Sequence, residues 1–181
     1  MRLALALLIL LIHTAGQAGT LTGRVTHVTN GDTLVVLDAG KAQHTIRLQG
    51  IDAPDQGQAY GNESKEHLSD HVAGKFVVVE YDKRDRYKRV VGKVFLAGQD
   101  MNLGQVAAGL AWHYKKHQVE QTQSDRISYS DAEREARRDR RGLWHDPNPV
   151  PPWEFRKAKR ERLKEMKPLT DKSDSIDFRQ K

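Results

Sequence analysis

The 181-residue chain carries a formal net charge of +6, with 38% hydrophobic and 30% charged residues. That length and composition indicate one compact domain with appendages rather than two full domains. The chain contains no cysteine, which excludes thiol catalysis and thiolate metal sites and leaves oxygen and imidazole ligands. The excess positive charge favours a polyanionic partner, either nucleic acid or an anionic membrane, and a solvated basic surface is the alternative interpretation.

The N-terminus has the pattern of a signal peptide. Arg2 precedes an almost unbroken apolar run from Leu3 to Ile12, and small residues follow at Ala15-Gly16-Gln17-Ala18. The run is short for a permanent membrane anchor, which is the alternative. We therefore expect residues 1–18 to be a cleaved signal peptide and the protein to be exported, to the periplasm or the extracellular medium.

The strand and helix patterns predict a small barrel that carries helices. Alternation of apolar and polar residues predicts five strands, at residues 20–30, 33–37, 44–51, 76–81 and 90–96. Asn30-Gly31-Asp32 indicates a tight turn between the first two strands, and three sequential strands with short connections predict a meander. Three helices are expected: one capped by Asn62 and ending near Gly74, one capped by Asp100, and one at residues 130–141.

The C-terminal part differs in composition from the rest. Pro147 to Pro152 is proline-rich, and a strongly basic segment follows. We expect a folded domain at residues 19–146, then a proline-rich exit and a basic, largely disordered tail at 147–181. Within this tail, residues 156–167 could form a transient helix, whereas the part after Pro168 has no pattern of buried residues. Affinity for nucleic acid and simple solubility explain such a tail equally well.

Acids and arginines recur at predicted strand ends and turns. They lie in four short motifs: Asn30-Gly31-Asp32-Thr33, Ile46-Arg47-Leu48, Ile51-Asp52-Ala53-Pro54-Asp55 and Asp85-Arg86-Tyr87-Lys88-Arg89. Each motif alone has an ordinary structural explanation. Together they supply what phosphodiester hydrolysis needs, because carboxylates suit hard cations such as Ca²⁺ and arginines suit phosphate oxygens.

The order and spacing of these motifs resemble the staphylococcal nuclease (thermonuclease) family. Further matches are Val106–Ala111 and the segment Ala136–Trp144, so the resemblance runs from about Leu21 to Trp144. It implies an α+β, mainly β fold: a five-stranded OB-fold barrel with three helices. It also implies a Ca²⁺-dependent endonuclease that hydrolyses DNA and RNA with low sequence specificity, with a monomer as the default state.

The resemblance also implies roles for single residues. Asp32 and Asp52 look like the carboxylate ligands of Ca²⁺, and the carbonyl of Ala53 looks like a third ligand. Arg47 resembles the arginine that holds the reacting phosphate. Arg89 resembles the second arginine, which favours departure of the leaving oxygen.

Three positions depart from the family pattern. Asp55 stands where the family usually has glutamate, the residue proposed to position or deprotonate the attacking water, and it is one methylene shorter. Asn30 replaces an acid seen in the staphylococcal enzyme. Lys88 replaces the glycine usual before Arg89.

Other aromatic and basic residues are candidates for contact with substrate: Tyr87, Lys88, Tyr114 and Lys115. Packing at the end of the second helix is an equal alternative for Tyr114. We interpret His113 and His117 as surface histidines and assign them no metal, because no third ligand is apparent.

Two further patterns have structural interpretations. The alternating charges of the third helix, Glu133 among them, are typical of a solvent-exposed face. Trp144 and Trp153 are expected to fix the C-terminal end onto the domain.

Two other classes of function compete with the enzyme. OB-folds also bind oligonucleotides without cleaving them, and a basic tail would suit an interaction protein of the cell envelope. A binding module that had lost activity would lack arginines or metal ligands, yet Asp32, Arg47, Asp52 and Arg89 are all present. The sequence therefore favours the enzyme.

Overall fold

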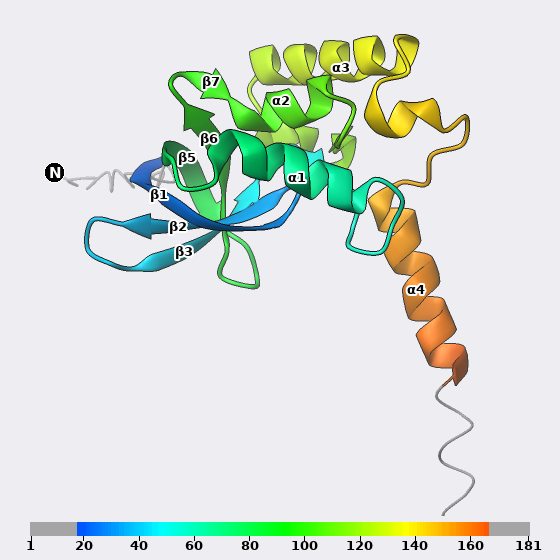
Figure 1. Ribbon diagram of the computed structural model, residues 1–181, viewed down its shortest axis with the longest axis horizontal. Helices are drawn as coiled ribbons and strands as arrows, with labels where there is room; N and C mark the ends of the chain where they lie inside the picture. The colour runs from blue at the N-terminus through cyan, green and yellow to red at the C-terminus, as the bar shows by residue number, and fades with distance from the viewer. Residues whose placement is uncertain (1–17, 167–181) are drawn as a thin grey trace, which may run out of the picture.

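A computed structural model describes residues 18–166, and its centre is a closed barrel of five long strands (Figure 1). These strands are β1 (Gly19–Asn30), β2 (Thr33–Asp38), β3 (Gln43–Leu48), β5 (Phe76–Arg84) and β6 (Val90–Leu96). The sheet order is β3-β2-β1-β5-β6-β7, and a parallel pairing of β3 with β6 closes the barrel. The predicted meander and mainly-β OB-fold barrel are confirmed.

Three short strands complete the β-structure. Strand β7 (Gln99–Asp100) extends the barrel sheet beside β6. Strands β4 (Ile51–Asp52) and β8 (Trp112–His113) form a separate antiparallel pair, in which Asp52 lies opposite Trp112. The predicted strand at 44–51 is therefore two strands, because the chain turns at Gly50, which has a φ of 77°.

The barrel interior is filled by the inward-facing residues of each strand. In β5, Val77 and Val79 are buried while Phe76 and Val78 are exposed, as the alternation of side chains along a strand requires. Leu34, Ile46 and Val90 are fully buried and belong to the same core. The apolar residues whose alternation predicted the strands thus face the core, and the residues between them face the surface.

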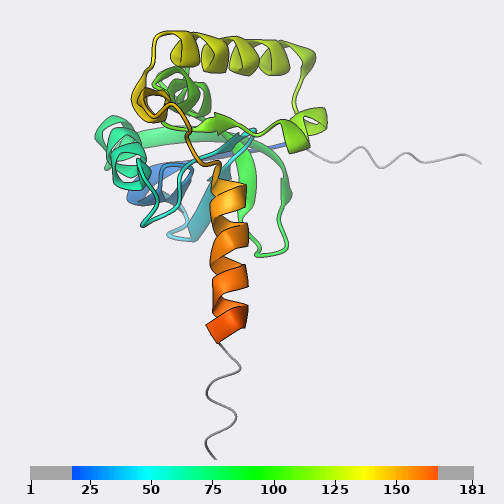
Figure 2. The same ribbon diagram turned by 90° about the vertical axis from the view of Figure 1, so that its right-hand side faces the viewer.

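The predicted three helices are α1 (Gly61–Val72), α2 (Met101–Ala107) and α3 (Gln123–Arg138). They lie together over one side of the barrel, with α3 outermost, in both views (Figures 1 and 2). Two short 3₁₀ helices, η1 (Lys115–Glu120) and η2 (Gly142–His145), flank α3 in the chain.

Two of the predicted helix starts are wrong. Asp100 caps α2 as expected, and its carboxylate accepts from Leu103 N at 3.0 Å. However, α1 starts before Asn62, and its N-cap is Tyr60 in a left-handed conformation with a φ of 64°. Helix α3 starts at Gln123 rather than at residue 130, with Thr122 as its cap.

A fourth helix, α4 (Pro152–Met166), occupies part of the predicted disordered tail. The helix starts at Pro152, where the sequence indicated at most a transient helix from residue 156. Residues 167–181 and nearly all of the predicted signal peptide lie outside the described residues. Helix α4 projects from the body of the domain (Figures 1 and 2). Its residues 157–166 are exposed, so only the first turn packs on the domain. Between residues 18 and 166, no helix is both long and apolar enough to cross a membrane.

Two buried amides of α2 connect this helix to the turns of the barrel. Gln105 Nε2 donates to Gly31 O at 2.7 Å and to Ser64 O at 2.9 Å. Asn102 Nδ2 donates to Gln49 O at 3.0 Å, and its Oδ1 accepts from Val94 N at 3.0 Å. Gln105 thus holds the β1–β2 turn against α1 and α2.

We expect Gln105→Leu to lower the free energy of unfolding by about 2–3 kcal/mol, because two buried carbonyls would lose their donor. Urea unfolding followed by circular dichroism measures this change. Gln123→Leu, at an exposed position on α3, is the matched control and should change the stability by less than about 0.5 kcal/mol. Equal effects of the two substitutions would contradict this role of Gln105.

Candidate active site

The β1–β2 turn holds the first carboxylate of the site. Asp32 is buried; its Oδ1 accepts from Thr33 Oγ1 at 2.8 Å, and its Oδ2 accepts from Ala53 N at 2.8 Å. Gly31 is required beside it, because a Cβ there would lie 1.8 Å from Ser64 Oγ. The tight packing of this turn against α1 therefore fixes the direction of the Asp32 side chain.

Arg47 on β3 joins Asp32 to the second carboxylate, Asp52 on β4. Its Nη2 lies 2.9 Å from Asp52 Oδ1 and 3.2 Å from Asp32 Oδ2, and its Nη1 donates to Leu48 O at 2.9 Å. The side chain of Asp52 is only 2% exposed. Burial raises the pKa of Asp52, against the opposing influence of its arginine neighbours. The structure thus brings Asp32, Arg47 and Asp52 together, as the sequence predicted.

A second guanidinium, which the sequence analysis missed, reaches the cluster from α4. Arg156 Nη2 lies 2.6 Å from Asp52 Oδ2, and Arg156 Nη1 lies 3.2 Å from Asp55 Oδ2. Asp55 is therefore also part of the cluster. The only signal for this contact was the pair of aromatic residues Trp153 and Phe155, which are unusual in a disordered basic segment.

Arg89 is held in a different place, by the loop between β5 and β6. Its Nε donates to Asp85 Oδ2 at 2.7 Å, and its backbone N–H donates to Asp85 Oδ1 at 3.0 Å. Partial burial opposes ionisation, yet these hydrogen bonds keep the pKa of Asp85 below its ordinary value. The structure pairs Arg89 with Asp85 rather than with the carboxylates of the cluster.

The other predicted residues of this loop are at the surface. Tyr87 is 64% exposed, and the guanidinium carbons of Arg86 and Arg89 lie 4.9 and 5.5 Å from its ring centroid. Lys88, which replaces the family glycine, has a φ of 65°, so the loop retains a left-handed conformation that glycine adopts at less cost.

A cavity of about 380 Å³ lies beside β8. It is lined by aromatic and charged residues, among them Trp112, Tyr114, Lys115, Glu133, Arg137 and Trp153. The ring centroid of Trp153 is 5.4 Å from that of Tyr114 and 5.5 Å from that of Trp112. Trp144 packs on Trp112 at 4.5 Å, so both tryptophans do fix C-terminal segments onto the domain.

Two charged or titratable residues near this cavity are buried, contrary to expectation. His113 is 2% exposed: its Nε2 lies 2.8 Å from Gln121 Oε1, and Ser130 Oγ lies 3.2 Å from its Nδ1. Glu133 is 3% exposed and lies 2.5 Å from Lys115 Nζ. The interpretation of His113 as a surface residue and of Glu133 as part of a solvated face was wrong.

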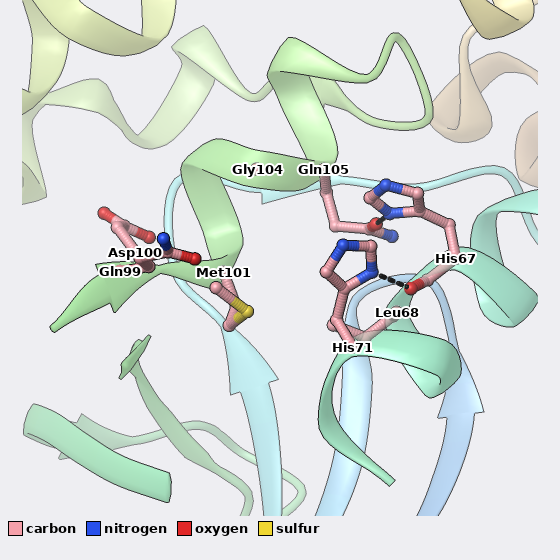
Figure 3. Close-up of a pocket in the computed structure, with 8 residues that line it drawn as sticks. All are labelled: His67, Leu68, His71, Gln99, Asp100, Met101, Gly104 and Gln105. Carbon is pink, nitrogen blue, oxygen red and sulfur yellow. Dashed lines mark hydrogen bonds between the residues drawn. The ribbon is translucent and has the colours of Figure 1, made fainter. Parts of the chain in front are cut away.

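A second cavity, of about 200 Å³, lies between α1 and α2 and shares no residue with the carboxylate cluster (Figure 3). His67 and His71 face it, and His71 Nδ1 donates to His67 O at 2.7 Å. The Nδ1 of His67 bonds to Gln105 Oε1. Within the described residues 18–166, no three His, Cys, Asp or Glu side chains are grouped to hold a metal ion.

Comparison with known proteins identifies the family of this chain. The family model described as "Staphylococcal nuclease homologue" matches residues 45–146, which include Arg47, Asp52 and Arg89. The chain therefore belongs to the staphylococcal nuclease family, and it is a nuclease, a hydrolase that acts on phosphodiester bonds.

Its relatives include proteins from bacteria and plants. An uncharacterized endonuclease of Escherichia coli is 43% identical over 138 residues, which cover 76% of this chain and 86% of the relative. A micrococcal nuclease of Shigella flexneri is 35% identical, with 86% of this chain and 91% of the relative covered. The staphylococcal-like nuclease CAN1 of Arabidopsis thaliana is 40% identical over 64% of this chain and 34% of its own.

The buried His113 should make stability depend on pH. Burial, with a smaller effect of the Lys115 charge, lowers the pKa of His113 below 6.5. Below pH 6.5 the histidine of the unfolded chain becomes protonated, whereas the buried His113 of the folded protein stays neutral. The folded state therefore has its full stability above pH 6.5 and loses stability as the pH falls from 6.5 through the folded pKa.

We expect wild type to lose more stability than His113→Asn between about pH 7.5 and pH 5.5, because only the wild-type unfolded chain gains a proton at this position. Urea unfolding at the two pH values measures the difference. Parallel losses in both proteins would show that His113 does not contribute to the pH dependence.

Proposed function

We propose that this protein is a Ca²⁺-dependent endonuclease that hydrolyses DNA and RNA with low sequence specificity. The observation that carries this proposal is the contact of one guanidinium, that of Arg47, with the two buried carboxylates of Asp32 and Asp52. Such a pairing of hard anionic oxygens with a fixed arginine suits a phosphate group bound together with a cation.

The donor set at this cluster fits Ca²⁺. Carboxylate oxygens of Asp32 and Asp52 and the carbonyl of Ala53 are hard ligands of the kind that this ion prefers. The two carboxylates lie close enough to share one guanidinium nitrogen, and the backbone N–H of Ala53 donates a hydrogen bond to Asp32 Oδ2. When bound, Ca²⁺ supplies charge neutralisation at a phosphate oxygen.

The arginines and Asp55 supply the remaining chemistry. The contacts of Arg47 with the carboxylates and with Leu48 O use its two Nη atoms, which leaves its Nε–H for a phosphate oxygen. Arg89, which Asp85 orients, would stabilise the leaving oxygen when the substrate spans the β5–β6 loop. Asp55 would orient or deprotonate the attacking water.

Residues around the cluster would hold the substrate without reading its sequence. Tyr87 and Lys88 are exposed on the β5–β6 loop, and Tyr114 and Lys115 line the cavity beside β8. Stacking of bases on aromatic rings contributes roughly 1–3 kcal/mol per base and tolerates any base. Such contacts favour single strands and frayed duplexes.

We propose further that the protein acts as an exported monomer, in the periplasm or in the extracellular medium. The support for export is the signal-peptide pattern of residues 1–18.

We expect the purified protein to digest denatured DNA and RNA with Ca²⁺ and to stop when a calcium chelator is added. Arg47→Ala should lower kcat by about 100-fold or more, because a donor aimed at the reacting phosphate is lost. Arg134→Ala, which removes an exposed arginine of α3, is the matched control and should retain wild-type rates. Release of acid-soluble nucleotides measures both.

Two results would contradict the proposal. Binding of DNA without cleavage under any divalent metal would identify a binding module in place of an enzyme. Full activity of Arg47→Ala would place the reaction elsewhere than at this cluster.

A further inference from the structure

Helix α4 brings a cation to Asp52, which the proposed function assigns to Ca²⁺, and to Asp55, which it assigns to the attacking water. The guanidinium of Arg156 contacts both oxygens of Asp52, at 2.6 and 3.4 Å, and both oxygens of Asp55, at 3.3 and 3.2 Å. A planar guanidinium that spans two carboxylates in this manner makes a strong, directional ion pair. The side chain is only 36% exposed, so solvent screens the interaction incompletely.

The position of Arg156 is set by hydrophobic packing as well as by charge. In the first turn of α4, Pro152 is buried and Trp153 packs on Trp112 and Tyr114. Phe155 lines a cavity together with Pro54 and Tyr60, in the loop that follows Asp52. The first turn of α4 is therefore docked on the two segments, β8 and residues 54–60, that border the site.

The charges of the cluster show why the Arg156 guanidinium and Ca²⁺ exclude each other. Three carboxylates, Asp32, Asp52 and Asp55, face two guanidiniums, those of Arg47 and Arg156, so one negative charge remains. Exchange of Arg156 for Ca²⁺ would neutralise the cluster, whereas Ca²⁺ beside both arginines would leave an excess positive charge on partly buried groups. Like charges held close together in such a setting repel strongly.

We propose that Arg156 is an intramolecular competitor of Ca²⁺: it occupies Asp52 and Asp55 until the ion displaces it, so that ion binding and the docking of α4 oppose each other. This inference rests on the proposed Ca²⁺ site. It concerns a helix that begins after residue 146, where the family match ends. By linkage, the factor by which docked α4 weakens Ca²⁺ binding equals the factor by which Ca²⁺ weakens docking.

Direct titration of Ca²⁺ into four purified proteins tests the competition: wild type, Arg156→Gln, Arg156→Lys and Arg160→Gln. Arg160 lies one turn further along α4 and is exposed, so its substitution removes the same charge without touching the cluster. We expect Arg156→Gln to bind Ca²⁺ about five- to tenfold more tightly than wild type. Arg156→Lys should be intermediate, because an ammonium group lacks the planar fork, and Arg160→Gln should match wild type. Isothermal titration calorimetry gives the four affinities.

Hydrogen exchange of the amides of α4 gives a second measurement that does not depend on activity. In wild type, Ca²⁺ should accelerate exchange at the first turn of α4, because its docking is weakened. In Arg156→Gln, exchange there should already be faster than in wild type without Ca²⁺ and should respond less to the ion.

The outcomes separate this inference from the function on which it rests. Unchanged or weaker Ca²⁺ affinity in Arg156→Gln, or an equal gain in Arg160→Gln, would overturn the competition and leave the calcium site in place. A failure of all four proteins to bind Ca²⁺ would remove the calcium site itself, and the competition with it.

Discussion

The contact of Arg47 with Asp32 and Asp52 is the interaction on which the site depends. Two buried carboxylates so near each other repel, and burial makes their ionised forms costly. One guanidinium between them offsets both effects, because it donates to Asp52 and lies 3.2 Å from Asp32. Arg47 itself is on β3, which pairs with β2 on one side and with β6 on the other. Closure of the barrel therefore determines where the guanidinium lies.

The barrel and the helices share the task of holding the two acids in position. Asp32 is on a turn that Gln105 of α2 and Ser64 of α1 pack against. Asp52 is on a strand paired with β8, which leads into the segment before α3. Asp32 and Asp52 thus lie on two segments, each supported by a different part of the fold.

The sequence predicted the barrel from local patterns. The assignment of Asp32, Arg47 and Asp52 to one site came from the resemblance of their motifs to the family, and the structure brings these three side chains into contact. Alternation of apolar residues marks strands whatever their partners are, and acids at strand ends converge when a barrel closes. It did not predict Arg156, because this arginine lies in a run of basic residues that all look alike without the fold. Glu133 was misassigned for the same reason: alternating charges on α3 conceal the one carboxylate that Lys115 and the His113 backbone bind in the interior.

A tethered cation differs from a dissolved one in how it competes. Trp153 and Phe155 have apolar contacts that do not require Asp52 or Asp55, so they keep Arg156 near the cluster even when its ion pairs are broken. The effective concentration of Arg156 at the cluster is then set by the short helical turn that carries it and not by the concentration of the protein. A competitor of this kind weakens Ca²⁺ binding by a constant factor, whatever the protein concentration. It also returns as soon as the ion leaves. The same packing that positions Arg156 therefore limits how far α4 can move. Binding of Ca²⁺ needs only to displace the Arg156 side chain and loosen one helical turn.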